Sequence, residues 1–200
     1  MTQLQAGEVI NAFVDKQDQH YLVNLEIQIN APQKAVYALI TNYAHLDMLS
    51  DSIVSSEILQ QITASRTQVK LVSKGCVLFM CQTVTQVQNV QELDNGYIHI
   101  DVDPSQSNVK LNTQLWQIEA LDNNMTRIHY SADVVPDFWI PPLIGSWVFQ
   151  NMLLEEVKTI IKNAEKWATL PLAPRYTTDK ESSRFNDGPT TQILILKKEN

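Results

Sequence analysis

Alternating apolar and polar residues predict that most of this chain forms β-strands. Near the N-terminus, the apolar residues Val23, Leu25 and Ile27 alternate with polar ones, the period-two pattern of a strand with one buried face. An earlier apolar run at 9–14 is expected to pair with this strand. Short polar turns separate the further predicted strands, which cover residues 53–61, 68–73, 77–90, 97–102, 109–118 and 127–135. Such short connections indicate antiparallel hairpins.

Helical spacing replaces the alternation in two parts of the chain. After Asn30-Ala31-Pro32, apolar residues at 36–40 predict a first helix, and residues 43–48 predict a second, short one. After Pro141 and Pro142, apolar residues recur at three- and four-residue steps from Leu143 to Thr169. A helix of about 27 residues spans about 40 Å, long enough to cross a small domain. Its apolar face therefore needs a broad partner.

The two cysteines, Cys76 and Cys81, lie near the start of the strand predicted at 77–90. On one regular strand they would point to opposite faces, about 16 Å apart, which predicts two separate buried thiols. A bulge or tight bend between them is the alternative. It would allow a disulfide and would imply an oxidising compartment. The alternation also slips near Thr83 and Val84, as it does at a β-bulge.

Composition favours one globular domain followed by a tail. Hydrophobic residues make up 44% of the chain and charged residues 18%, enough apolar content for a sizeable core over residues 8–169. Residues 170–200 are rich in proline, charge and small polar residues, so we expect a flexible tail. Within it, the β-prone segment Gln192–Leu196 is either disordered or adds to a sheet edge of this chain or a neighbour.

Charge and hydropathy exclude several classes of partner. Fifteen basic and 22 acidic residues give a formal charge of −7, and the basic residues do not cluster, so we expect no nucleic-acid binding. No apolar run is long enough for a transmembrane segment, and the first residues lack a signal-peptide pattern. These features predict a cytoplasmic protein. The alternative is a periplasmic protein whose signal peptide has been removed.

No catalytic, metal or cofactor motif is recognisable in the chain. The four histidines occur in no triad order and at no metal-ligand spacing; they are His20, His45, His99 and His129. His99 shares a strand face with Asp101, and His129 shares one with Asp133, but alternation assigns both faces to the solvent side. We therefore expect no catalytic residues, no metal and no cofactor.

Two longer stretches resemble a known superfamily. The segment NAPQKAVYALITNYAHLDMLSDSI resembles the opening of START-like, or Bet v 1-like (SRPBCC), proteins, with Ala-Pro at the helix start and Asn-Tyr near its end. The segment PDFWIPPLIGSWVFQNMLLEEV resembles the polyketide cyclase/dehydrase and coenzyme-Q-binding branch, which commonly has a Pro-x-Phe/Trp-x-Pro-Pro approach to the last helix. Together the resemblance covers roughly residues 20 to 169.

The resemblance implies an α+β helix-grip fold. A curved antiparallel sheet of about six to seven strands would wrap around the long C-terminal helix, with two short helices after the first strand. A strongly twisted sheet curls, so one helix across its concave face covers the apolar side and leaves a cavity. In this family such a cavity takes a lipid, an isoprenoid quinone or a polyketide.

We therefore predict non-catalytic binding, transport or chaperoning of a hydrophobic small molecule between the sheet and the last helix. Pockets for such molecules are mostly apolar, and the expected lining is aromatic and aliphatic. We expect it to comprise Tyr37, Tyr43, Phe79, Trp116, Phe138, Trp139, Leu143, Trp147 and Leu154. The simpler interpretation is that these residues only fill the core. The alternative functions are a cyclase/aromatase-like enzyme with a buried acid or base, and a protein-interaction module with an exposed apolar patch.

Overall fold

A computed structural model of the protein describes residues 7–77, 80–140 and 146–169. These residues form eight strands, two α-helices and three short 3-10 turns. The strands are β1 Glu8–Gln17, β2 His20–Ile29, β3 Ile53–Thr63, β4 Arg66–Val77, β5 Met80–Glu92, β6 Tyr97–Val102, β7 Val109–Asp122 and β8 Met125–Pro136. The helices are α1 Gln33–Ile40 and α2 Ser146–Ala168, and the 3-10 turns are η1 Leu46–Met48, η2 Asp94–Gly96 and η3 Pro104–Gln106.

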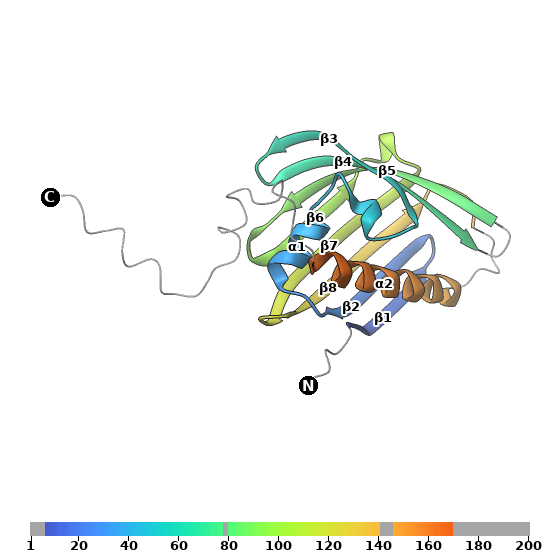
Figure 1. The fold of residues 1–200 in the computed structure, drawn as a ribbon. Helices are drawn as coiled ribbons and strands as arrows, with labels where there is room; N and C mark the ends of the chain where they lie inside the picture. The colour runs from blue at the N-terminus through green and yellow to red at the C-terminus, as the bar shows by residue number, and fades with distance from the viewer. Residues whose placement is uncertain (1–6, 78–79, 141–145, 170–200) are drawn as a thin grey trace.

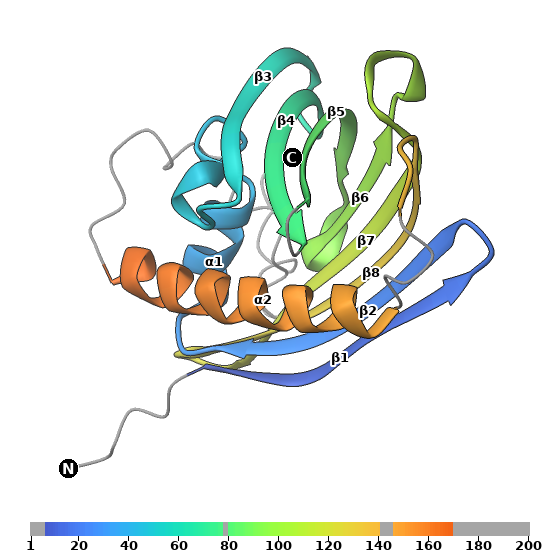
Figure 2. The same cartoon turned by 90° about the vertical axis from the view of Figure 1, so that its right-hand side faces the viewer.

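All eight strands belong to one antiparallel sheet in the order β1-β2-β8-β7-β6-β5-β4-β3. Strands β2 and β8, which are distant in sequence, lie side by side, and β1 and β3 form the two open edges. The sheet is strongly curved, and α1 and α2 lie across its concave side (Figures 1 and 2). The architecture is the α+β helix-grip fold expected from the sequence, with eight strands in place of six or seven and with the short helices following β2.

The side of the sheet that faces α2, called here the inner face, carries the core. Ile118 of β7 and Ile128 of β8 are paired across the strands, and both are fully buried in the core cluster. On the helix side, Val157, Ile161 and Ala164 are the buried residues, at the three- and four-residue spacing expected from the sequence. The opposite, outer face of the sheet carries the charged residues that alternate with this apolar set.

The C-terminal part of α2 is also anchored by a carboxylate. Glu165 Oε1 accepts a hydrogen bond from the backbone N–H of Gly7 at 2.6 Å and another from that of Asn30 at 3.0 Å. Both N–H groups lie at ends of the first two strands. Charge-assisted bonds of this kind are stronger than neutral ones, so they fix the end of the helix against the β1–β2 edge.

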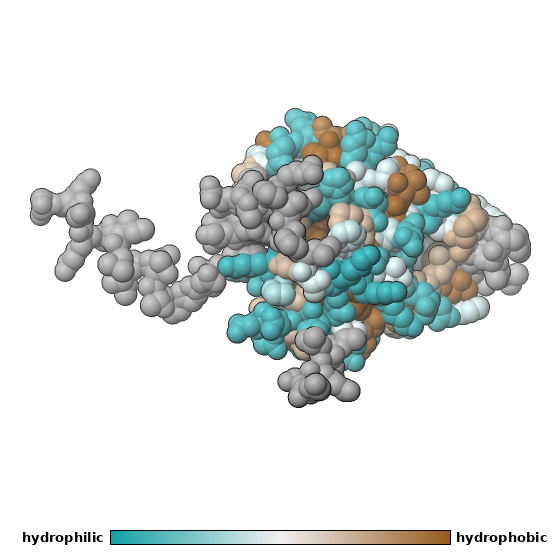
Figure 3. All heavy atoms as spheres, in the orientation of Figure 1, coloured by the Kyte–Doolittle hydropathy of each residue, from teal (hydrophilic) through white to brown (hydrophobic). Residues whose placement is uncertain are grey.

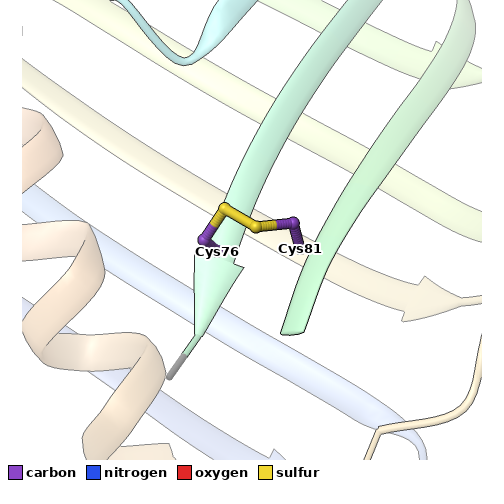
Figure 4. The surroundings of a disulfide bond; sticks show 2 residues. All are labelled: Cys76 and Cys81. Carbon is purple, nitrogen blue, oxygen red and sulfur yellow. A yellow bond between two sulfur atoms is a disulfide. The ribbon is translucent and has the colours of Figure 1, made fainter. Parts of the chain in front are cut away.

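The turn between β4 and β5 corrects the expectation of two separate thiols. β4 continues to Val77 and β5 begins at Met80, so β4 extends four residues beyond the predicted strand end at Ser73. Cys76 and Cys81 are therefore directly opposite each other, with their Cα atoms 4.0 Å apart, and form a disulfide (Figure 4). Both residues are exposed. The alternative interpretation, in which a tight bend allows a disulfide, is therefore the correct one.

Two smaller expectations also change. The pairing of β4 with β5 is continuous past Thr83 and Val84, so there is no bulge here. The alternation slips because the other edge of β5 is bound by a loop, in which Asn108 Oδ1 accepts from Thr85 N at 2.8 Å. Residues 43–48 contain only the 3-10 turn η1. The predicted start of the last helix at Leu143 and the tail at 170–200 lie outside the described residues.

The edge strand β3 exposes apolar side chains along its length. They are Val54, Ile58, Leu59 and Ile62. Apolar surface shows as brown patches at the top of the molecule in Figure 3, where β3 and β4 run. Among the described helices, none combines the length and hydropathy needed to cross a membrane.

Candidate functional site

The two halves of α2 meet the sheet differently. In the C-terminal half, Val157 and Ile161 are buried in the core cluster. In the N-terminal half, the apolar residues Phe149, Met152 and Leu153 are only half-buried. Water therefore reaches apolar side chains of this half, although the helix lies across the inner face (Figure 2).

This half of α2 nevertheless reaches from one side of the sheet to the other. The ring of Phe149 packs edge-on against Tyr21 of β2, with the centroids 4.7 Å apart. At the other side, a Cβ atom built on Gly75 of β4 would lie 3.7 Å from Met152 Cε. The helix thus bridges β2 and β4 above the central strands. The inner face of the sheet beneath this half of the helix is the candidate site.

The floor of the candidate site changes along β7 and β8. At one end, Ile118 and Ile128 are fully buried in the core cluster, where α1 packs on both strands. Further along the same face, Trp116, Tyr130 and Val134 are only half-buried. The sheet is therefore sealed at the α1 end and open to water toward the N-terminal end of α2.

Trp116 and Tyr130 form an aromatic pair at this transition. They face each other across β7 and β8, with ring centroids 4.5 Å apart and an angle of 59° between the rings. Burial raises the pKa of the Tyr130 hydroxyl well above its usual range. Both rings pack against the core cluster, and part of each side chain stays accessible to solvent.

Beyond the aromatic pair, the inner face carries a cluster of four amide side chains, called here the amide cluster. Its members are Gln86, Gln88, Asn112 and Gln114. Asn112 Nδ2 donates to Gln86 Oε1 at 2.5 Å, and Gln88 Nε2 donates to the same oxygen at 3.3 Å. The indole N–H of Trp116 donates to Gln114 Oε1 at 3.2 Å. The cluster and the aromatic pair are therefore continuous.

Of the nine residues expected to contact ligand, the structure places Trp116 on this floor. Tyr37 and Tyr43 are buried in the core cluster, and the Tyr37 hydroxyl donates to Glu92 Oε2 at 2.8 Å. Phe138 and Leu154 are half-buried, whereas Trp139 and Trp147 are 70% and 66% exposed. Phe79 and Leu143 lie outside the described residues.

Sequence reasoning missed the amide cluster and Tyr130. Asn112 and Gln114 stand in phase with Trp116 and Ile118 on β7, but the mixed polarity of that set left its orientation open. The signal lay in the neighbouring strand, where Ile128, Tyr130 and Ala132 form a clearly apolar face. Pairing these two sets across the strands identifies the inner face of β7.

The outer face carries the histidines whose carboxylate neighbours were considered from sequence. His20 contacts Asp133 at 2.8 Å, and His99 contacts Asp101 at 3.4 Å. His129 lies 3.5 Å from Glu119 instead. An open groove of about 380 Å³ lies on this face, lined by Asn11, Asn24, Leu25, Glu26, Tyr97, Leu115, Gln117, His129, Tyr130 and Ser131. The histidine pairs lie across the sheet from the amide cluster.

Comparisons with known proteins agree with this architecture. A family model described as polyketide cyclase / dehydrase and lipid transport matches residues 29–157. A search of curated proteins gave no significant match. A START superfamily protein from Mycobacterium smegmatis has a similar structure, with a TM-score of 0.60 and 15% identity, covering 72% of this chain and 97% of that chain.

Two further solved structures have names that describe different activities. The Zhui aromatase/cyclase from Streptomyces sp. R1128 gives a TM-score of 0.51 at 16% identity, covering 74% of this chain and 91% of that one. A STAR-related lipid transfer protein from Xanthomonas axonopodis gives 0.55 at 12% identity, covering 80% and 99%. At these identities the likeness establishes a common fold.

Proposed function

Because the chain belongs to the polyketide cyclase/dehydrase and lipid transport family, whose fold binds hydrophobic ligands, we propose that it binds such a molecule without reacting with it. The ligand would lie between the inner face of the sheet and the N-terminal half of α2. The observation that carries the proposal is the incomplete burial of Phe149 and Met152 on a helix whose C-terminal half contributes Val157, Ile161 and Ala164 to the buried core. A lipid, a quinone or a polyketide would have suitable apolar surface, and the role would be transport or chaperoning.

Desolvation would supply the driving force. Burying about 300 Å² of ligand apolar surface is favoured by roughly 7 kcal/mol at about 25 cal/mol per Å², less the cost of association. The shape of the hollow would then set selectivity.

The histidine pairs offer little support for the cyclase alternative. His129 with Glu119 and His99 with Asp101 lie on the outer face, with the sheet between them and the proposed ligand. For this reason we favour a binding function over catalysis.

Organic extraction of the native chain and of a variant with a larger side chain at the proposed ligand position tests the binding proposal. Organic extraction of purified protein, analysed by mass spectrometry, is expected to release one class of apolar molecule. Val134→Trp would fill the space above β8 and should lower the extracted amount severalfold, whereas Leu115→Trp on the outer face should not. Circular dichroism confirms that both variants are folded. An empty extract from the unaltered protein, or equal loading of both variants, contradicts the proposal.

We also infer that the protein works in an oxidising compartment, the periplasmic alternative to the cytoplasmic expectation. The support is the exposed disulfide between Cys76 and Cys81, because exposed disulfides do not persist in a reducing cytosol.

Alkylation of the protein in freshly lysed cells tests this location. With a maleimide-polymer reagent we expect no mass shift before reduction and two adducts after it, because the chain has two cysteines. The Cys76→Ser variant is the control, and it should give one adduct without reduction. Two adducts on the unreduced native chain would place the protein in a reducing compartment.

A further inference from the structure

The amide cluster is unusual because it puts four polar side chains on the buried side of an apolar sheet. Gln88, Asn112 and Gln114 are each 7% exposed or less. Their neighbours on the inner face are apolar, such as Ala132 and Val134 on β8. A polar group in such surroundings is unfavourable unless its hydrogen bonds are completed.

Within the described residues those hydrogen bonds are not complete. Asn112 Oδ1 is buried and has no hydrogen-bond partner. Leaving a buried acceptor unpaired costs about 1–3 kcal/mol. Asn112 Nδ2 and Gln88 Nε2 both donate to the same oxygen, Gln86 Oε1. No N–H group of the described residues donates to Asn112 Oδ1, which is therefore an unused acceptor.

A small rearrangement would make this acceptor reachable. Neighbouring side chains cover Asn112 Oδ1 in the structure, but the bond from Gln88 Nε2 to Gln86 Oε1 is long, at 3.3 Å, and therefore weak. Turning the Gln88 side chain away would break only this weak hydrogen bond. A donor that enters between the sheet and α2 could then supply the missing hydrogen bond.

The charge around the cluster defines what kind of donor fits. Amides are uncharged, and the positions that flank them on the inner face of β7 and β8 are uncharged too. Two carboxylates, those of α2 and of the end of β5, are already engaged: Glu156 accepts from Ser52 Oγ at 2.7 Å, and Glu92 accepts from Tyr37. An anionic head group would lose its hydration without gaining a countercharge.

The aromatic pair adds a preference for rings. Trp116 bonds to Gln114 of the cluster and packs against Tyr130, so an apolar ring can lie beside them while its polar end reaches the amides.

We propose that the amide cluster recognises the uncharged hydroxyl of a ring-containing apolar ligand, with Asn112 Oδ1 as the acceptor. The proposal rests on the binding function proposed above and assigns the chemical class of its ligand. It excludes pure hydrocarbons and carboxylate-headed lipids as preferred ligands.

Three fluorescent probes of similar size test the proposal: 1-hydroxypyrene, pyrene and 1-pyrenecarboxylate. Titrations at about pH 6 keep the hydroxyl neutral and the carboxylate ionised. We expect the hydroxyl probe to bind about tenfold more tightly than pyrene, corresponding to one net hydrogen bond, and the carboxylate probe to bind most weakly.

Two matched variants of β7 locate the effect. Asn112→Leu removes the inner-face acceptor and should abolish the preference for hydroxypyrene while leaving pyrene affinity within about twofold. Gln117→Leu makes a similar change on the outer face and should alter neither. The melting temperature checks folding, and Asn112→Val replaces the leucine variant if that variant fails to fold.

The outcomes separate the two proposals. Equal binding of pyrene and hydroxypyrene, tightest binding of the carboxylate, or a preference that survives Asn112→Leu overturns the hydroxyl assignment and leaves the binding function standing. Failure of all three probes to bind, together with an empty organic extract, overturns the binding function itself.

Discussion

Tyr130 combines two properties that a surface or core tyrosine does not have together. Burial raises the pKa of its hydroxyl, yet part of the side chain is reachable by water. Within the described residues no hydrogen bond to this hydroxyl is present. The phenol therefore stays neutral at ordinary pH and can serve as a second polar contact beside Asn112.

The raised pKa of Tyr130 predicts a specific loss of stability at high pH. The unfolded pKa is about 10, so the stabilisation due to the neutral phenol is complete below that pH and is lost as the pH rises toward the folded-state value. The free energy of unfolding, measured with denaturant at about pH 9 and pH 11, should fall more for the native chain than for Tyr130→Phe. Equal losses in both proteins would show that the hydroxyl is not buried.

Single residues of the site were the least predictable feature of the sequence. Trp116 was expected in the ligand-binding lining, and the structure places it on the inner face. Tyr37 and Tyr43 lie in the core because α1 packs directly on the closed end of the sheet. The orientation of Asn112 and Gln114 stayed open, because hydropathy cannot distinguish a polar group on a solvent-exposed face from one on the buried face.

At the scale of elements, local patterns were a better guide. The alternation in β2, β6 and β8 and the helical spacing in α1 and α2 predicted those elements within a few residues. The β4–β5 hairpin was misjudged because Lys74-Gly75 has the composition of a turn. In the structure Gly75 lies within β4, opposite Gln82, and the chain turns only after Val77.

Removing the disulfide should loosen this hairpin and leave the rest of the fold in place. The bond closes a loop of few residues, so chain-entropy arguments limit its contribution to about 2 kcal/mol. Chemical denaturation of the Cys76→Ser/Cys81→Ser double variant should show a loss of that order, and reducing the native chain should show the same loss. A much larger loss would mean that the bond also supports α2, which reaches the neighbouring Gly75 through Met152.

Over the whole molecule, the arrangement divides uncharged from charged surface. The inner face holds the apolar core, the aromatic pair and the amide cluster, whereas the outer face holds pairs such as Arg127 with Glu26 and His129 with Glu119. The family resemblance implied that a curved sheet wraps around the C-terminal helix. It could not give the strand order, in which β2 pairs with β8, because such pairing depends on contacts between distant parts of the chain.

The open edge at β3 has a practical consequence. Its outward backbone N–H and C=O groups have no neighbouring strand among the described residues, and the strand displays Val54, Ile58, Leu59 and Ile62 to solvent. Two copies meeting there can continue each other's hydrogen-bond ladder at little cost. In concentrated or slowly refolded samples, molecules will therefore tend to associate through their β3 edges. Ile58→Lys would be the simplest way to keep the protein monodisperse.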